Sequence, residues 1–379
     1  MKMRIACDDL ANMLGRLQGF LFSARNSLLQ VCSNVHLRVE ESGDLHLSAT
    51  DLQISFHGTL KVKDQEPGET LVDGKRLYAM VKQLPAEEVL IELKDSAEGE
   101  GALQLTSGRS HMSLLSLGTQ DFPELPSTED LTFSTVQGST LASLFERTLF
   151  SMSSDEARPN LNGVLFVHKG DNVLRSVSTD GYRITICERQ EEREGLELPT
   201  FSGLLIPRKG AIELKRLLEQ YPEVELATSE NNVVVRTTDC TVHVRLLADQ
   251  YVPYEEVIPK SNNNAYKIER QPLLNALKRM NLVGEERLHR VSFDFQGAEL
   301  LIESANANLG KVEERVELLE GSTDHEMQVS FSSVYVLDVL NTIKSETVEM
   351  HLGATSTQPV IFKDPTWMQD TFVVVPLRS

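Results

Sequence analysis

The sequence is poor in cysteine and contains no long apolar run. Its 379 residues include four cysteines, which lie far apart and form no CxxC pair: Cys7, Cys32, Cys187 and Cys240. This spacing argues against a disulfide framework or a zinc site and favours reduced, buried thiols. No apolar stretch approaches the roughly 18 residues that a membrane-spanning helix requires, and the start, MKMRIACDDL, lacks the apolar stretch of a secretion signal. We therefore predict a cytoplasmic protein without membrane contact.

Recognisable catalytic motifs are also missing. The sequence has no GxxxxGK[ST] phosphate-binding loop, no HExxH zinc pair and no GxSxG nucleophile turn. The histidines are scattered, and three of them fall in alternating strand patterns where a structural imidazole is expected: His111, His243 and His351. We predict that the protein is not an enzyme and binds neither a cofactor nor a metal.

What is present is an ordinary globular composition with a strong acidic excess. Hydrophobic residues make up 40% and charged residues 25%, which excludes a largely disordered chain. The length suits two to four domains. The net charge of −19 argues against a nucleic-acid partner, unless the positive charges are concentrated on one surface.

One paired-strand pattern occurs three times along the chain. Its copies read NVHLRVEESGDLHLSATDLQISF, NGVLFVHKGDNVLRSVSTDGYRITI and HRVSFDFQGAELLIESANANLGKV. The Thr-Asp pairs at 50–51 and 179–180 lie 129 residues apart, and Ala305-Asn306 occupies the same place 126 residues further on. Alternating apolar and polar residues on both sides of a Gly, Asp or Asn turn are typical of a hairpin. We predict that these Asp and Asn residues form turns.

Each copy is accompanied by two short amphipathic helices. One follows the hairpin between two strands, as in TLVDGKRLYAMVKQLPAEEVLIEL, and the other precedes it, as in DDLANMLGRLQGF. Pro-containing segments from Asp121 and Tyr251 suit linkers between repeats. We predict an α+β protein of three repeated domains with boundaries at 1–121, 129–250 and 253–379, each with two helices packed on antiparallel sheets.

The positive charge is concentrated in the predicted helices. Together the six helices carry a net charge of +7, which leaves −26 for the rest of the chain. Helices on one side of the sheets would then form a basic surface opposite an acidic one. Two such chains would supply twelve helices, and at about 8–10 Å between axes these would enclose a hole of roughly 25–28 Å, wide enough for hydrated duplex DNA. A basic lining would attract phosphates without reading bases.

Several segments resemble one known family. The stretches SMSSDEARPNLNGVLF, SVSTDGYRIT, LLIPRKGAIELKRLLE, SSVYVLDVLN and VVVPLR are similar to the beta subunit of bacterial DNA polymerase III, the replicative sliding clamp, and the resemblance runs the whole length. It implies a sliding-clamp fold in which a head-to-tail homodimer closes a six-domain ring around double-stranded DNA. It also implies a processivity factor that tethers DNA polymerase subunits, and a clamp loader that places it on DNA.

The resemblance implies three sets of site residues. A cleft for short hydrophobic peptides would be lined by Leu161, Thr179, Gly181, Tyr182, Arg183, Ile184, Pro253, Val257, Tyr335, Val373, Val374, Val375, Pro376, Leu377 and Arg378. Sequence-independent DNA contacts would come from Arg25, Lys75, Arg76, Arg208 and Lys209. The dimer interface would bring Met112 and Leu114 of one copy against Leu282 and Val283 of the other.

The sequence departs from the family pattern at the cleft. Tyr182 stands where a histidine is usual, and Glu255 and Glu256 replace a basic stretch at the rim. These departures bear on which peptides bind. Three alternatives stay open: a specialised paralogue of the clamp, a repeat-β interaction scaffold of the adhesion kind, and a metal-dependent nuclease. The scaffold would lack the basic helix surface, and the nuclease would need convergent acidic residues.

Overall fold

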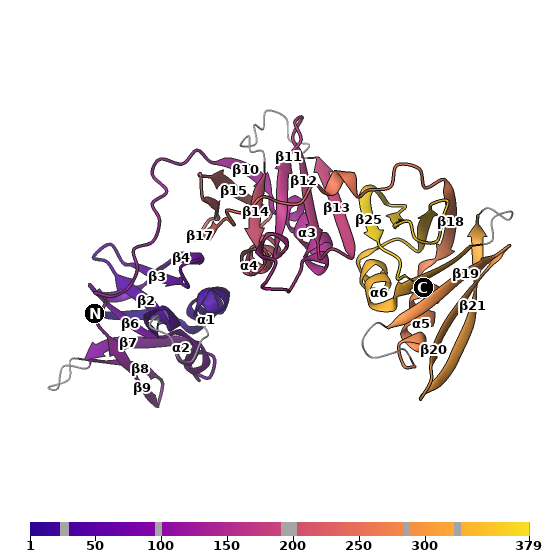
Figure 1. Cartoon of the computed structure of the whole chain (residues 1–379). Helices are drawn as coiled ribbons and strands as arrows, with labels where there is room; N and C mark the ends of the chain where they lie inside the picture. The colour runs from indigo at the N-terminus through magenta and orange to yellow at the C-terminus, as the bar shows by residue number, and fades with distance from the viewer. Residues whose placement is uncertain (23–29, 95–100, 191–202, 284–288, 322–326, 379) are drawn as a thin grey trace. The chain divides into compact units, whose positions relative to one another are not determined.

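The structure is a computed structural model that describes the chain except residues 23–29, 95–100, 191–202, 284–288, 322–326 and 379. The chain divides into two compact units. Unit 1 contains residues 1–142, 195–199 and 209–246, and unit 2 contains residues 143–194, 200–208 and 247–379. Six α-helices and 25 strands occur in the described part of the chain (Figure 1).

Unit 1 is built around one sheet with the strand order β10-β15-β16-β17-β4-β3-β2-β6-β9-β8-β7-β1-β5. Its strands are β1 (Lys2–Ala6), β2 (Asn34–Val39), β3 (Asp44–Thr50), β4 (Ile54–Lys61), β5 (Lys63–Glu66), β6 (Gly68–Asp73), β7 (Glu88–Lys94), β8 (Gly101–Ser107), β9 (Ser110–Leu117), β10 (Ser134–Gln137), β15 (Glu223–Thr228), β16 (Asn232–Arg236) and β17 (Cys240–Arg245). Its helices are α1 (Cys7–Leu17), α2 (Gly74–Val81) and nearly all of α4 (Arg208–Leu218).

Unit 2 is built around a second sheet with the order β14-β11-β12-β13-β25-β24-β23-β18-β21-β20-β19-β22. Its strands are β11 (Gly163–His168), β12 (Val173–Thr179), β13 (Arg183–Gln190), β14 (Leu204–Pro207), β18 (Asn264–Glu269), β19 (Arg290–Gln296), β20 (Glu299–Asn306), β21 (Gly310–Glu320), β22 (Met327–Ser332), β23 (Thr347–Leu352), β24 (Val360–Asp364) and β25 (Trp367–Val374). Its helices are α5 (Arg270–Met280), α6 (Ser333–Thr342) and the second half of α3 (Gly138–Thr148).

The turn prediction for the repeated hairpins is confirmed. The Asp51 carboxylate accepts the backbone N–H groups of Gln53 and Ile54, and the Asp180 carboxylate accepts those of Tyr182 and Arg183. In the third copy the Asn306 side chain accepts the N–H of Asn308. Short acidic and amide side chains hold such turns because they reach backbone donors two residues ahead.

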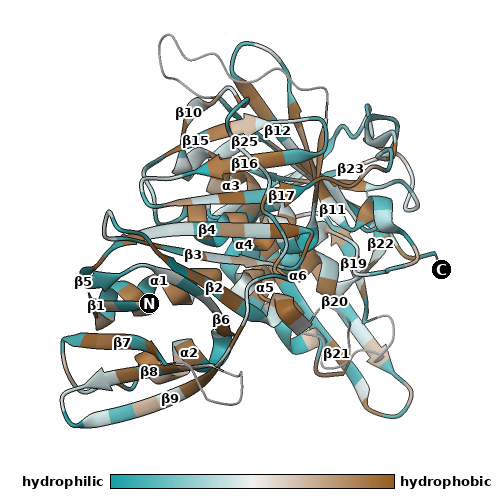
Figure 2. Ribbon diagram, turned by 90° about the vertical axis from the view of Figure 1, so that its left-hand side faces the viewer, coloured by the Kyte–Doolittle hydropathy of each residue, from teal (hydrophilic) through white to brown (hydrophobic). Residues whose placement is uncertain are grey.

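Alternation of apolar and polar residues builds the cores. The burial of β23 alternates along its length, and in Figure 2 the strand ribbons carry both apolar and polar segments. The core of the third repeat is aromatic, and Tyr266, Phe293, Phe331, Phe362 and Phe372 are fully buried in it. All four cysteines are free and buried, as predicted.

Adjacent repeats are joined edge to edge by strand pairing. In unit 1, β17 of the second repeat pairs antiparallel with β4 of the first, with Val244 opposite Ile54. In unit 2, β25 of the third repeat pairs in the same way with β13 of the second, with Val374 opposite Arg183. The second repeat therefore contributes strands to both sheets, and the chain separates into two units although it contains three repeats.

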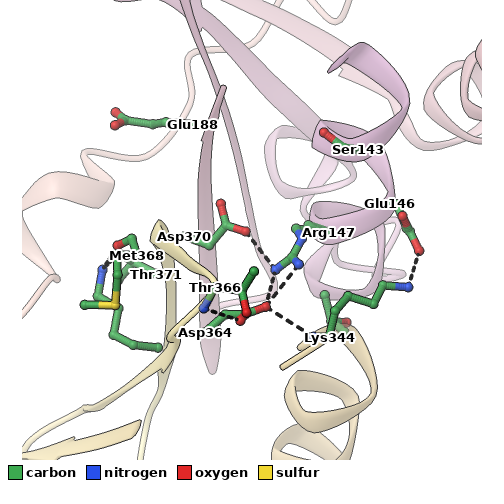
Figure 3. Close-up of polar contacts among 12 residues, drawn as sticks. Ser143, Glu146, Arg147, Glu188, Lys344, Asp364, Thr366, Met368, Asp370 and Thr371 are labelled. Atoms are coloured by element: carbon green, nitrogen blue, oxygen red, sulfur yellow. Dashed lines mark hydrogen bonds and ion pairs between the residues drawn. The ribbon is translucent and has the colours of Figure 1, made fainter. Parts of the chain in front are cut away.

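A buried ion-pair network fastens the second repeat to the third. Arg147 of α3 donates to Asp364 at 3.0 Å and pairs with Asp370 at 2.8 Å (Figure 3). Arg189 of β13 binds the same Asp370 at 2.6 Å, and both guanidinium groups lie over the ring of Trp367. The two aspartate side chains are wholly inaccessible to solvent.

The buried charges of this network are stabilised by hydrogen bonds and ion pairs. Burial alone would raise the pKa of Asp364, but hydrogen bonds from Ser345, the backbone of Lys344 and Arg147 hold that pKa below its ordinary value. A buried charge is tolerated only while its partners remain in place. The junction therefore depends on every member of the network.

Replacing Asp370 with alanine should destabilise unit 2 by about 3–5 kcal/mol, because Arg147 and Arg189 would keep buried charges without this partner. Urea denaturation of the Asp370→Ala variant measures the loss. Glu146→Ala provides the matched control, because Glu146 of α3 also pairs across this junction, with Lys344, but on the exposed surface. Such a pair contributes about 0–1 kcal/mol, so equal losses in both variants would contradict the account.

Candidate functional site

The first part of the predicted peptide cleft is a tight turn between β12 and β13. Gly181 has a φ of +91°, the left-handed region that favours glycine. The Thr179 hydroxyl accepts the Gly181 N–H at 3.0 Å and donates to the Arg183 carbonyl at 2.7 Å. This turn presents the Tyr182 ring to solvent, where it stacks on Tyr335 of α6 with 6.1 Å between ring centroids.

Arg183 holds the turn and the Tyr335 ring in place. Its guanidinium donates to Asp180, to Asp338 of α6 and to the Phe150 carbonyl. It also lies 4.7 Å from the centroid of the Tyr335 ring. With all these contacts made and little exposed surface, Arg183 positions Tyr335 and the turn and offers little to a ligand.

The C-terminal segment forms a second wall of the predicted peptide cleft. Val373 and Ile184 are cross-strand partners and share one apolar cluster with Val177, Ile186 and Tyr254. Val375 continues the wall and donates its N–H to the Tyr182 carbonyl at 2.9 Å. Val374 faces the other way, into the core of the third repeat, because neighbouring side chains of a strand point to opposite faces.

The remaining predicted cleft residues vary in exposure. Val257 and Pro253 are exposed, whereas Leu161 is buried. Pro376 is buried. Leu377 donates its N–H to the carbonyl of Ser330 on β22. The Arg378 carbonyl accepts a hydrogen bond from Arg290.

Sequence reasoning missed part of the same surface. Tyr254 and Ile258 belong to the apolar cluster, and beside it lies a hollow of about 310 Å³ lined by Arg175, Ile186, Glu188, Glu255, Ile258, Lys260, Gln369 and Thr371. The apolar residues of the linker after Tyr251 could have indicated this part of the surface from the sequence. Glu255 is paired with Arg175 at 2.8 Å, so at this rim Glu256 is the acidic residue without a described ion pair.

The predicted DNA contacts lie at helix starts. Lys75 and Arg76 occupy the first turn of α2, and Arg208 and Lys209 occupy the first turn of α4. Neither first turn holds an acidic residue. Because the amino end of a helix carries a partial positive charge, cations there are unfavourable for the helix itself. An anion bound at these helix starts would offset this unfavourable charge.

Two of these residues have acidic neighbours. Lys209 pairs with Asp51, whose side chain is nearly buried, and thereby links α4 to the turn before β4. The Arg76 side chain stays exposed, 3.7 Å from Asp73, the residue that caps α2. The predicted contact Arg25 lies outside the described residues.

The predicted dimer residues differ in exposure. Leu282, directly after α5, is 79% exposed, and Val283 and Met112 are half-buried. Leu114 of β9 is buried within its own unit, and the neighbouring Leu115 is 62% exposed.

The described part of the chain contains no group of three or more His, Cys, Asp or Glu side chains placed to hold a metal ion. Among the described helices none has both the length and the apolar character needed to cross a membrane.

Comparison with known proteins covers the whole chain. Residues 1–126, 135–253 and 255–378 match the N-terminal, central and C-terminal domains of the DNA polymerase III beta subunit. The beta sliding clamp of Escherichia coli K12 is 31% identical over 381 residues, and the match covers 100% of both chains. The beta sliding clamp of Pseudomonas putida is 30% identical over 363 residues, with 93% of this chain and 94% of that protein covered.

Solved structures agree. The DNA polymerase sliding clamp of Pseudomonas aeruginosa matches with a TM-score of 0.88 at 29% identity, covering 100% of both chains. The clamp of Caulobacter crescentus matches with a TM-score of 0.90 at 26% identity, covering 100% of this chain and 99% of that one. On three matched domains and full-length relatives, this chain belongs to the DNA polymerase III beta subunit family, the bacterial sliding clamps.

Proposed function

We propose that two copies of this chain close head to tail into a ring that encircles duplex DNA. The ring tethers a DNA polymerase through the predicted peptide cleft beside Tyr182, Ile184, Val257, Val373 and Val375, which we call the Tyr182 cleft. The observation that carries the proposal is the strand pairing between repeats. Each internal junction joins the strand after the repeated turn, β4 or β13, to the last strand of the next repeat, β17 or β25. The equivalent strands left over are β21 and β9.

These two strands have open edges. Within the described residues, β9 pairs with β8 along its length but with β6 only at Ser116 and Leu117. β21 pairs with β20, and with β18 only near its end, at Leu318 and Glu320. An open strand edge is a ready site for pairing with another chain. A second copy supplies the complementary edge, and two such junctions close a ring.

The internal repeats also give the register of this pairing. Leu117, Leu247 and Leu377 are equivalent, because each lies beside the strand that leads into the second helix of its repeat. Leu114, Val244 and Val374 each lie three residues before these leucines and are therefore equivalent. Ile54, Arg183 and Leu309 each lie three residues after the turn residues Asp51, Asp180 and Asn306 and are equivalent in the same way. Leu114 should therefore face Leu309 of the partner copy.

Exposure supports this register. Ile54 is 1% exposed and Arg183 8%, because each is covered by the next repeat, whereas Leu309 is 64% exposed. Burying a leucine contributes about 1.5–3 kcal/mol. The exposed Leu282 beside α5 adds apolar surface to the same junction.

Ion pairs should be rearranged at the subunit junction. The first helix of each repeat carries an arginine at the same position: Arg16, Arg147 and Arg279. Arg16 pairs with Asp239 of the next repeat at 2.7 Å, and the Asp239 carbonyl accepts the N–H of Thr59. The equivalents of Asp239 and Thr59 at the subunit junction are Arg109 and Glu314. Glu314 already pairs with Arg279, so it should bridge Arg279 and the partner's Arg109.

We further infer that the protein acts in the cytoplasm. Four buried, reduced thiols suit a reducing compartment. DNA replication in bacteria takes place there.

DNA binding should be topological. Once loaded on a closed circular plasmid, the ring should stay bound at salt concentrations that abolish ordinary phosphate contacts, because a closed ring does not depend on counterion release. Gel filtration of the complex before and after a single restriction cut measures retention. Retention on the linear plasmid with free ends would disprove encirclement.

The proposed register predicts a charge-reversal rescue. Glu314→Arg should raise the dimer Kd about tenfold or more, because three arginines would meet at the junction. Adding Arg109→Glu should restore most of the affinity, and sedimentation equilibrium measures both. Glu317→Arg on the same strand, beyond the reach of β9, is the control. If Arg109→Glu brings no recovery, the register is wrong.

The cleft should bind short peptides with two or three apolar anchors at a Kd on the order of micromolar. Val257→Asp should weaken this binding at least tenfold, because the exposed Val257 side chain would otherwise cover an anchor. Met368→Asp introduces the same charge at a similarly exposed apolar residue on the β24–β25 hairpin and should change little. Calorimetric titration compares the three proteins, and equal affinities would remove Val257 from the cleft.

A further inference from the structure

A second hollow lies at the junction of the first and second repeats, within unit 1. It has a volume of about 330 Å³. Its walls are Thr50, Leu52, Gln53, Ile54, Ser55, Pro123, Glu124, Leu125, Pro126, Asn231, Asn232, His243 and Arg245. We refer to it as the 1–2 hollow.

The 1–2 hollow is the repeat equivalent of the Tyr182 cleft. Its first wall is the turn from Thr50 to Ser55, which corresponds to the turn from Thr179 to Ile184. Its second wall is the Pro-containing linker that follows the last strand of the preceding repeat, as at Pro253. Its third wall is the last strand of the next repeat, with His243 opposite Ser55, as Val373 is opposite Ile184.

The chemistry of the two sites differs position by position. Ser55 replaces Ile184, His243 replaces Val373, and Arg245 replaces Val375. At these three positions, side chains that are apolar in the Tyr182 cleft are replaced in the 1–2 hollow by side chains that can form hydrogen bonds. A peptide with only apolar anchors would leave these polar groups without partners, which disfavours its binding.

Leu52 is held in an unfavourable conformation at the mouth of the hollow. Its φ is +74°, close to the +91° of its equivalent Gly181. A leucine in this region is rare and costs conformational energy that glycine does not. Its side chain is nevertheless 47% exposed, so packing within unit 1 does not account for it. Hydrogen bonds to the Thr50 and Asp51 side chains hold the turn, and the Leu52 side chain stands at the mouth as apolar surface open to a ligand.

Arg245 is the cationic side chain of the hollow. Burial lowers the pKa of His243 to about 4, so this imidazole is neutral near pH 7. Arg245 is exposed, and its guanidinium forms no hydrogen bond or ion pair with the described residues. Glu124 is the only acidic residue of the lining. A planar guanidinium among amide side chains is suited to a carboxylate, which it can bind through two parallel hydrogen bonds.

We propose that the 1–2 hollow is a second docking site, which takes a short extended peptide carrying a carboxylate side chain next to an apolar one. The carboxylate lies against Arg245 and the amides of Asn231 and Asn232, and the apolar side chain lies on Leu52. The site is independent of the Tyr182 cleft and of ring closure. One chain can thus hold two partners of different chemistry.

The test uses the full-length protein and two fluorescein-labelled peptides of about seven residues. One alternates leucine with aspartate, and its twin alternates leucine with lysine. Fluorescence anisotropy should detect the acidic peptide with a Kd below about 1 mM and the basic twin at least tenfold more weakly. Absence of binding by the acidic peptide, or equal binding of both, would overturn the proposal.

Two variants locate the site. Arg245→Glu should weaken the acidic peptide at least tenfold, while Arg38→Glu, which makes the same charge change elsewhere on unit 1, should leave it unchanged. Leu52→Gly should weaken it several-fold without lowering the unfolding temperature, because glycine relieves the positive φ. The Val257→Asp variant should retain the acidic peptide, which separates this site from the Tyr182 cleft. Undiminished binding to both Arg245→Glu and Leu52→Gly would contradict the assignment.

Discussion

Strand pairing between repeats is the constraint on which the rest of the structure depends. Because β4 pairs with β17 and β13 with β25, each repeat completes its neighbour's sheet. The same pairing leaves β9 and β21 with open edges, so the last strands of the series can be completed only by another copy. Within the chain, the pairing also forms the two inter-repeat surfaces, the Tyr182 cleft and the 1–2 hollow. Assembly and partner binding therefore follow from one geometric rule.

Electrostatics distinguishes junctions that share this geometry. The arginine near the end of each first helix is retained, but its partner changes. Between the second and third repeats the partner is a buried pair of aspartates, and between the first and second it is the half-exposed Asp239. At the proposed subunit junction the acid is Glu314 of the same repeat, in an exposed pair that salt screens. A ring that must open to admit DNA benefits from an exposed, salt-screened pair at the junction that opens and from a buried network at a junction that stays closed.

The two inter-repeat surfaces show how repetition allows specialisation. The backbone of both is fixed by the same turn, linker and strand, so only side chains differ. Apolar residues at 184, 373 and 375 suit hydrophobic peptides, whereas Ser55, His243 and Arg245 suit a polar, acidic ligand. Leu52 adopts a conformation that Gly181 adopts without strain, and it presents apolar surface at the mouth of the 1–2 hollow where the Tyr182 cleft has none at the equivalent position.

The sequence by itself determined the three-repeat architecture, the turns at Asp51, Asp180 and Asn306, and the family, because periodic patterns and local turn chemistry depend on near neighbours. The wide spacing of the four cysteines likewise indicated buried free thiols. The sequence did not reveal that Arg183 is bound by Asp338, that Val374 faces a core while Val373 faces the cleft, or that Lys209 is held by Asp51. Those facts depend on which strand pairs with which edge and in which register, and residues more than a hundred positions apart meet only in the tertiary structure.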